Sequence, residues 1–199
     1  MIILLDNGHG NNTAGKRSPD GLFREYKYTR LIANRIALEL QDKGYDARIL
    51  VPEEFDVALS VRCKRANQVC SKYGKQNVIL VSIHVDAAGA DGQWHNATGW
   101  SVYTSRGQTR ADKLAYELYA TAEVVLSGKK IRKDLSDGDP DYEAGFYILK
   151  NTACSAVLTE NFFQDTKTDV SWLLSIDGQN AITKLHVDGI INYIKKYGK

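Results

Sequence analysis

Two short apolar runs that each end near a histidine constrain the fold of this chain more than any other feature. Residues 2–5 are all isoleucine or leucine, and polar residues and glycines follow at once, among them His9. Residues 78–83 repeat the pattern with mostly branched side chains and lead directly into His84. Continuous runs of this kind are typical of strands buried on both faces of a sheet. Ligands of open α/β sheets bind where the carboxyl ends of strands emerge, so we predict that both histidines lie at one sheet edge.

Predicted strands and helices alternate along most of the chain. The apolar pattern predicts helices over residues 23–43, 57–73, 109–126 and 179–197. It predicts strands over residues 1–6, 46–51, 77–86, 99–104, 146–149 and 155–160, with 99–104 as an edge strand. A long loop, basic at its start and acidic later, is expected at 127–144. This order predicts one α/β domain over residues 1–199, with a twisted, mostly parallel sheet of about six strands and helices on both faces.

Charge and hydropathy exclude several classes of partner. The 26 basic and 24 acidic residues nearly balance, which gives no reason to expect nucleic acid or an anionic membrane as the main partner. No apolar run approaches the roughly 18 residues that a membrane-spanning helix needs. The sequence begins directly with a core strand, so we expect no signal peptide and synthesis in the cytoplasm.

The three cysteines do not form a recognisable disulfide or zinc pattern. Cys63 and Cys70 lie on one predicted helix at a separation of about 10 Å, too far for a disulfide. No pair has the CxxC spacing of a cysteine zinc site. We therefore expect Cys63, Cys70 and Cys154 to be buried free thiols.

His9, Glu25 and His84 form the most informative set of polar residues. Taken singly, each histidine is more often a hydrogen-bonded structural residue, and Glu25 fits a helix N-terminal acid favoured by the macrodipole. Taken together, they end or begin elements that meet at one edge of a parallel sheet. Two histidines and one carboxylate are a common catalytic zinc set, which leaves a fourth position for water. We therefore predict one Zn²⁺ per chain, held by these three residues.

Glu160 ends another apolar run and is the candidate proton-transfer group. Taken alone, it is more simply explained as a solvated strand end, but at the same sheet edge it would face the metal. A carboxylate there can take a proton from water and pass it to a leaving amine. Burial would raise its pKa and a metal ion would lower it. His95 lies in a polar loop and His186 on the last helix, so we leave both outside the site.

Four motifs in register resemble those of the zinc-dependent N-acetylmuramoyl-L-alanine amidases of the amidase-3 family, which includes bacterial autolysins and phage endolysins. The motifs are Asp6-Asn7-Gly8-His9-Gly10, Glu25, Ser82-Ile83-His84-Val85-Asp86 and Thr159-Glu160-Asn161. Weaker similarities lie at residues 59–67, 99–103 and 147–150, so the resemblance covers essentially the whole chain. It implies that His9, Glu25 and His84 bind zinc, that Glu160 is catalytic, and that a six-stranded sheet lies between helices. Two departures are Asp86, where the family often has Asn, and Phe162, where it tends to have Gly.

The function expected from this resemblance is hydrolysis of the amide between N-acetylmuramic acid and L-alanine in peptidoglycan. A catalytically inert peptidoglycan-binding module and a zinc peptidase that cuts within the stem peptide are the alternatives. We expect a single catalytic domain without a wall-binding domain, a monomer, and no membrane insertion. Such a protein would reach the wall after release, as a phage lysin does, or by non-classical export.

Two secondary expectations concern residues around the site. Asp6 would either orient His9 or cap the following loop. The basic start of the 127–144 loop (Lys129, Lys130, Arg132 and Lys133) would either meet stem-peptide carboxylates or remain solvated.

Overall fold

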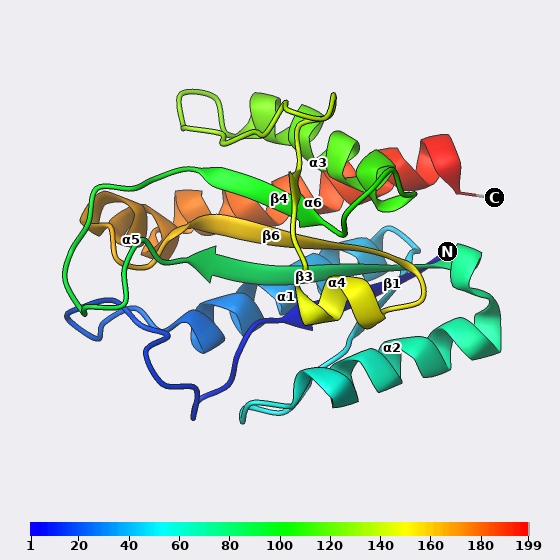
Figure 1. The fold of residues 1–199 in the computed structure, drawn as a ribbon, viewed down its shortest axis with the longest axis horizontal. Coiled ribbons are helices and arrows are strands. Elements are labelled where there is room, and N and C mark those ends of the chain that lie inside the picture. The colour runs from blue at the N-terminus through cyan, green and yellow to red at the C-terminus, as the bar shows by residue number, and fades with distance from the viewer. Residues whose placement is uncertain (199) are drawn as a thin grey trace.

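Six strands and six α-helices make up residues 1–198, the part of the chain that this computed structural model describes (Figure 1). The strands are β1 (Ile2–Asn7), β2 (Asp46–Ile49), β3 (Val78–Asp86), β4 (Trp100–Thr104), β5 (Tyr142–Glu143) and β6 (Ser155–Phe163). The helices are α1 (Glu25–Asp42), α2 (Leu59–Tyr73), α3 (Ala111–Val125), α4 (Tyr147–Asn151), α5 (Lys167–Leu174) and α6 (Ile176–Tyr197). A short 3-10 turn, η1 (Lys75–Asn77), precedes β3.

The six strands form one sheet in the order β2-β1-β3-β6-β4-β5. β2, β1, β3 and β6 are parallel, β4 runs antiparallel to β6, and β5 is parallel to β4. The predicted mostly parallel α/β sheet is confirmed. The two apolar runs that predicted central strands are β1 and β3, which pair with each other in the middle of the sheet.

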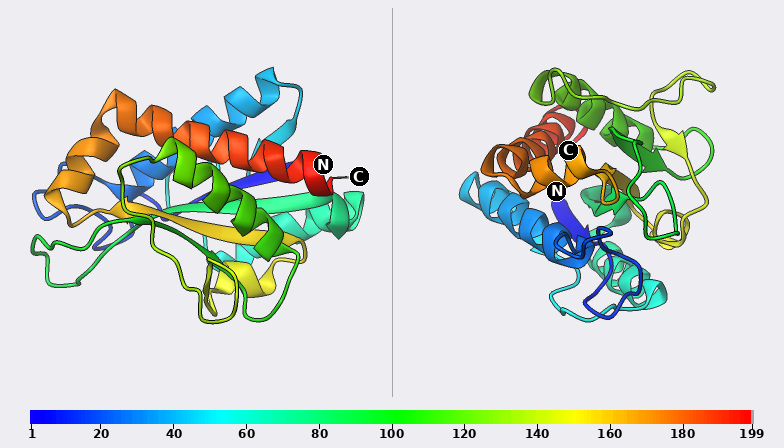
Figure 2. Two further views of the ribbon diagram at one scale, coloured as in Figure 1. Left: turned by 90° about the horizontal axis from the view of Figure 1, so that it is seen from above. Right: turned by 90° about the vertical axis from the view of Figure 1, so that its left-hand side faces the viewer.

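Helices cover both faces of the sheet because successive side chains of each strand point in opposite directions. Ile3 and Leu5 of β1 face a large core that contains the apolar sides of α1, α3 and α6. Ile2 and Leu4 face a smaller core on the other side, built with α2 and α4. Figure 2 shows α1 and α6 side by side along the face with the larger core. No helix in the described part of the chain is both long and apolar enough to cross a membrane.

The structure differs from the prediction in four elements. Residues 146–149, predicted as a strand, belong to the start of helix α4 (Tyr147–Asn151). A four-residue apolar run cannot distinguish a strand from a buried helical turn, and here Ile148 and Leu149 pack into the smaller core. The strand at 99–104 is not an edge strand, because β5, inside the predicted loop, pairs with Tyr103 and Thr104. Helix α5 (Lys167–Leu174) was not predicted, and α6 begins before residue 179.

The cysteine prediction is confirmed. Cys63, Cys70 and Cys154 are free and buried, and all three belong to the smaller core. The thiols therefore act as small apolar side chains in the core between α2 and the sheet.

Candidate metal centre

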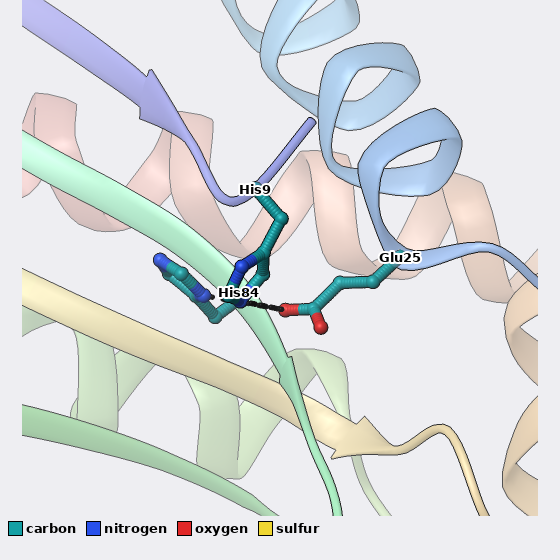
Figure 3. A group of neighbouring side chains, drawn as sticks. All are labelled: His9, Glu25 and His84. Carbon is teal, nitrogen blue, oxygen red and sulfur yellow. Dashed lines mark hydrogen bonds and ion pairs between the residues drawn. The ribbon is translucent and has the colours of Figure 1, made fainter. Parts of the chain in front are cut away.

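His9, Glu25 and His84 meet at the carboxyl edge of the central strands, as predicted. His9 follows β1, Glu25 is the first residue of α1, and His84 lies near the end of β3 (Figure 3). Glu25 Oε1 lies 3.2 Å from His84 Nδ1 and 3.5 Å from His9 Nε2. One donor atom from each residue lies within 4.8 Å of the other two. Three elements that are distant in sequence thus present one carboxylate and two imidazoles to a common point.

The loop after β1 is shaped around the His84 ring. A Cβ atom on Gly8 would lie 2.5 Å from Cε1 and 2.6 Å from Nδ1 of His84, closer than any side chain tolerates. Gly8 also donates its N–H to Ile83 O at 3.0 Å, which ties the loop to β3. His9 has a φ of 60°, a left-handed conformation that costs a non-glycine residue about 1–2 kcal/mol. The loop therefore accepts local strain while it holds both histidines together.

The donor set fits a zinc ion. Zinc–ligand distances of about 2.0–2.2 Å with tetrahedral angles place neighbouring ligand atoms about 3.3 Å apart, close to the two measured separations from Glu25 Oε1. Glu25 is completely buried, and its Oε2 atom has no hydrogen-bond partner within residues 1–198. A buried carboxylate in contact with two imidazoles is an arrangement that a cation stabilises.

The protonation states of His9 and Glu25 suit metal binding. Burial, opposed by Glu25, lowers the pKa of His9 to about 4, so its ring is neutral at pH 7 and its lone pair is available. Burial alone would raise the pKa of Glu25, but the hydrogen bond and charge of His84 hold it below its ordinary value. Lys16, whose Nζ is 3.9 Å from Glu25 Oε2, acts in the same direction.

Glu160 lies beside this set. In the parallel register of β3 and β6, Glu160 is the partner of His84, so both side chains point to the same face of the sheet. Burial, followed by repulsion from Glu25 and Asp86, raises the pKa of Glu160 well above its ordinary value, and Lys16 only partly opposes this. Its Oε2 atom is buried and has no hydrogen-bond partner in the described residues. The carboxyl is therefore free to exchange a proton with a bound ligand.

A cavity of about 630 Å³ opens over these residues on the face of the sheet covered by α2 and α4. His9, His84 and Glu160 lie on its polar side, together with Asp6, Thr13, Asp56, Arg62 and Ser82. Apolar and aromatic side chains line the other side, among them Val57, Leu59, Phe146, Tyr147, Ile148 and Leu158. A volume of this size accommodates a small-molecule or peptide segment rather than a single ion.

Comparison with known proteins places this geometry in a family. A family model described as N-acetylmuramoyl-L-alanine amidase matches residues 3–192. The chain belongs to the N-acetylmuramoyl-L-alanine amidase family. It is 28% identical over 195 residues to the amidase CwlM of Bacillus licheniformis, covering 94% of this chain and 66% of the relative. It is 25% identical over 202 residues to the endolysin of Bacillus phage SPP1, covering 99% and 68% respectively.

The fold comparison agrees with this assignment. The catalytic domain of the amidase CwlV from Bacillus (Paenibacillus) polymyxa var. colistinus superimposes with a TM-score of 0.81 at 20% identity. The alignment covers 98% of each chain. By contrast, the chain spans about two thirds of the length of the curated relatives that it matches. The similarity to the curated relatives thus concerns part of their length and nearly all of this chain.

Asp6 does not orient His9, so that alternative was wrong. Asp6 Oδ1 accepts a hydrogen bond from Arg62 Nη1 at 2.8 Å, and Oδ2 accepts one from Ser82 at 2.6 Å. Arg62 is 2% exposed and also donates to the carbonyl oxygens of Asn7 and Val57 at 2.7 and 2.8 Å. This buried arginine on α2, not Asp6, holds the amidase loop that carries His9. Sequence reasoning assigned it no role, because Lys64 and Arg65 follow it on the same helix and nothing local distinguishes Arg62 from them.

The basic start of the 127–144 loop lies away from the cavity. Arg132 donates to Asp86 Oδ2 at 2.7 Å and to Ser101 Oγ at 2.8 Å. Lys133 pairs with Glu123, and the Lys129 ammonium lies 4.5 Å from the centre of the Trp172 ring. Lys129, Arg132 and Lys133 thus have partners within the chain, while the three lysines of this segment are exposed. The contact with stem-peptide carboxylates stays a prediction.

The two departures from the amidase family pattern have visible consequences. β6 carries one extra residue opposite the end of β3, because His84 pairs with Glu160 but Asp86 pairs with Phe163. Phe162 lies in this bulge with a φ of 65°, a conformation that favours glycine. Its buried ring packs against Trp172 at a centroid distance of 4.9 Å, which offsets the backbone cost.

The remaining histidines lie outside the metal set, as predicted. His95 contacts Asp91 at 2.9 Å in an exposed loop. His186 is completely buried on α6, where its ring contacts Thr159 Oγ1 at 2.9 Å and Ile182 O at 2.8 Å. Its hydrogen bonds are satisfied, so it acts as a core residue.

Proposed function

We propose that this chain is a zinc-dependent hydrolase that cleaves the amide between the lactyl group of N-acetylmuramic acid and L-alanine of the peptidoglycan stem peptide. The observation that carries the proposal is the convergence of His9, Glu25 and His84 at one point. His9 and His84 line the same cavity as Glu160. Membership of the amidase family and the names of its relatives support the same reaction.

His9 Nε2, Glu25 Oε1 and His84 Nδ1 are the atoms that would hold the zinc ion. A zinc ion bound there supplies Lewis acidity, which polarises a carbonyl and lowers the pKa of water toward about 7. Glu25 Oε1 would be a zinc ligand, and it also accepts a hydrogen bond from the N–H of Val85 at 3.0 Å. This second bond fixes the carboxylate against the end of β3.

Glu160 is the proposed proton carrier. Its carboxylate takes a proton from the attacking water and later delivers it to the nitrogen of the departing alanine, so no net proton remains on the residue. Its raised pKa favours this role, because the carboxyl must hold the proton between the two transfers. The apolar wall formed by Tyr147, Ile148 and Leu158 reduces the water around the scissile bond.

The two rival functions predict different products. An inert binding module needs no Glu160, and the intact carboxylate beside the three metal-binding side chains favours catalysis. A zinc peptidase would share the metal centre but would release amino termini other than alanine. Because peptidoglycan lies outside the membrane, either activity requires that the chain reach the wall by release or by export.

The decisive experiment is digestion of purified peptidoglycan with and without a chelator, with new alanine amino termini and new reducing sugar ends measured separately. We expect alanine termini that disappear on chelation and return with zinc, and no new reducing ends. The variant Glu160→Gln should retain stoichiometric zinc but lose about 10²–10⁴-fold in turnover. Full activity of a zinc-loaded Glu160→Gln protein would refute the role of Glu160, and termini other than alanine would move the cleavage site into the stem peptide.

The same proposal includes a monomeric chain that acts on the wall polymer directly. Light scattering at assay concentration should give a mass near the 22.2 kDa of one chain. A stable dimer would show that the monomer expectation is wrong without affecting the chemistry.

A further inference from the structure

A second cavity, of about 720 Å³, lies at the opposite end of the strands from the metal centre. It is bounded by the turn between β4 and α3, by the end of α4, and by the amino ends of β3 and β6. It shares no lining residue with the cavity over Glu160. Helix α4, which lies in front of the sheet in Figure 1, separates the two: residues 146–148 line the first cavity and Leu149 and Lys150 line the second.

The second cavity is strongly basic. Four cationic side chains line it and no carboxylate does: Lys75, Arg106, Arg110 and Lys150. The whole chain has a formal charge of only +2, so this is a local concentration of positive charge. None of the four makes a side-chain hydrogen bond or an ion pair with any part of the chain that the structure describes. Arg48, Arg62, Arg65 and Arg132, in contrast, are all paired with carboxylates.

The nearest carboxylates are already engaged. Asp112 accepts hydrogen bonds from the N–H and the hydroxyl of Thr109, which caps the first turn of α3. Glu143 accepts the N–H of Gly107 at 2.7 Å. The attraction for an anion therefore comes from the four cationic side chains.

We propose that this cavity binds the oxyanion groups of an anionic polymer and thereby holds the domain on its substrate. Two arginines provide planar forks that match phosphate or carboxylate oxygens, and two lysines add point charges around them. A cavity of this size takes more than one such group, which is the chemistry of a repeating chain rather than of a single ion. Anion binding stands on the cavity alone, whereas its benefit to catalysis rests on the proposed amidase function.

The test compares two variants with the same change in net charge. The cavity variant is Arg106→Gln/Arg110→Gln/Lys150→Gln. The matched control is Lys43→Gln/Lys64→Gln/Lys195→Gln, which removes three exposed lysines outside this cavity. Since all six side chains are exposed, both variants should keep the thermal unfolding midpoint of the parent chain.

Binding is measured by fluorescence anisotropy with two labelled polymers, poly(glycerol phosphate) and poly(glutamate), at low and high salt. We expect the parent chain to bind at least one of them, with an affinity that falls in 0.5 M salt because exposed charges are screened. The cavity variant should lose about tenfold in affinity, and the control should remain within about threefold. Preference for the first polymer identifies phosphodiester groups, and preference for the second identifies carboxylates. Equal losses in both variants, or no binding by the parent chain, would overturn the proposal.

Activity assays separate this inference from the proposed function. On a small soluble muramoyl peptide, the cavity variant should keep the parent rate, because none of its three residues lines the cavity over Glu160. On intact walls that carry the anionic polymer, its rate should fall about tenfold while the control is unchanged. A parent chain inactive on both substrates would refute the amidase function. The polymer-binding assay would still show whether the basic cavity binds an anionic polymer.

Discussion

Removal of Arg62 should destabilise the fold more than any other single arginine substitution. Its guanidinium donates to two carboxylates, the buried Asp6 and, at 3.1 Å, the partly exposed Asp56. It also donates to the carbonyl oxygens of Val57, Asn7 and, at 3.4 Å, His9. It therefore joins α2 to the end of β1 and to the loop that carries a proposed zinc ligand. Asp6 is 1% exposed, so Arg62→Met would leave a buried carboxylate with only the Ser82 hydroxyl as partner.

The magnitude follows from this burial. Breaking a buried ion pair by removing one partner costs about 3–5 kcal/mol. For a domain of this size, each 1 kcal/mol lowers the unfolding midpoint by about 2–4 °C, so Arg62→Met should lower it by about 6–20 °C. Arg65, three residues along α2, provides a matched control, since its pair with Glu53 is about one third exposed. Arg65→Met should cost at most about 1 kcal/mol.

Thermal and urea unfolding of the metal-free proteins measure both changes. The double variant Asp6→Asn/Arg62→Met should recover at least about 1 kcal/mol relative to the sum of the single changes, because the uncompensated charge is gone. If Arg62→Met costs no more than Arg65→Met, the buried ion pair does not hold α2 to β1, and the argument fails.

Three further substitutions test the strained and buried positions near the site. Gly8→Ala should keep the folded circular dichroism spectrum but weaken zinc binding at least about tenfold, because its Cβ displaces the His84 ring; unchanged affinity in a zinc titration would contradict this. Phe162→Gly removes about 1–2 kcal/mol of backbone strain but also a buried ring worth about 3–5 kcal/mol, so urea unfolding should show a net loss of about 2 kcal/mol. Burial lowers the pKa of His186 to about 4, below the 6.5 of an unfolded chain, so its contribution to stability is lost as the pH falls between these values. His186→Gln should reduce that acid-induced loss by up to about 3 kcal/mol, and an identical pH–stability profile would show that His186 does not titrate as argued.

Sequence patterns predicted the centre of the sheet well because burial on both faces leaves a continuous apolar run. β1 and β3 were recognised in this way, and the polar residues that follow each run placed His9 and His84 at one edge. The position of Glu25 followed from the start of α1. Each of these is a local signal, readable within a few residues of the side chain concerned.

Features that depend on partners distant in sequence were not readable. The two-residue strand β5 forms by pairing with the end of β4, and the residues of Tyr142–Glu143 alone do not predict that pairing. Arg62 acts through contacts with residues more than fifty positions earlier in the chain, at the end of β1. Likewise, the four cationic side chains of the basic cavity come from three segments that are distant in sequence, around residues 75, 106–110 and 150.

The position of Glu160 shows how strand register, rather than loop conformation, places the proposed proton carrier beside the candidate metal centre. Glu160 faces the metal centre only because it pairs with His84 across two parallel strands, and a shift of one residue would turn it to the opposite face. The apolar residues that precede it fix this register, since Leu158 and Ala156 must face the smaller core while Val157 faces the larger one. The bulge that contains Phe162 comes just after Glu160. The pairing register between β3 and β6 therefore changes only beyond the Glu160–His84 pair. The alternation of side chains along β6 therefore has two effects. It directs apolar residues into the two cores, and it directs the Glu160 carboxyl to the same face of the sheet as His84.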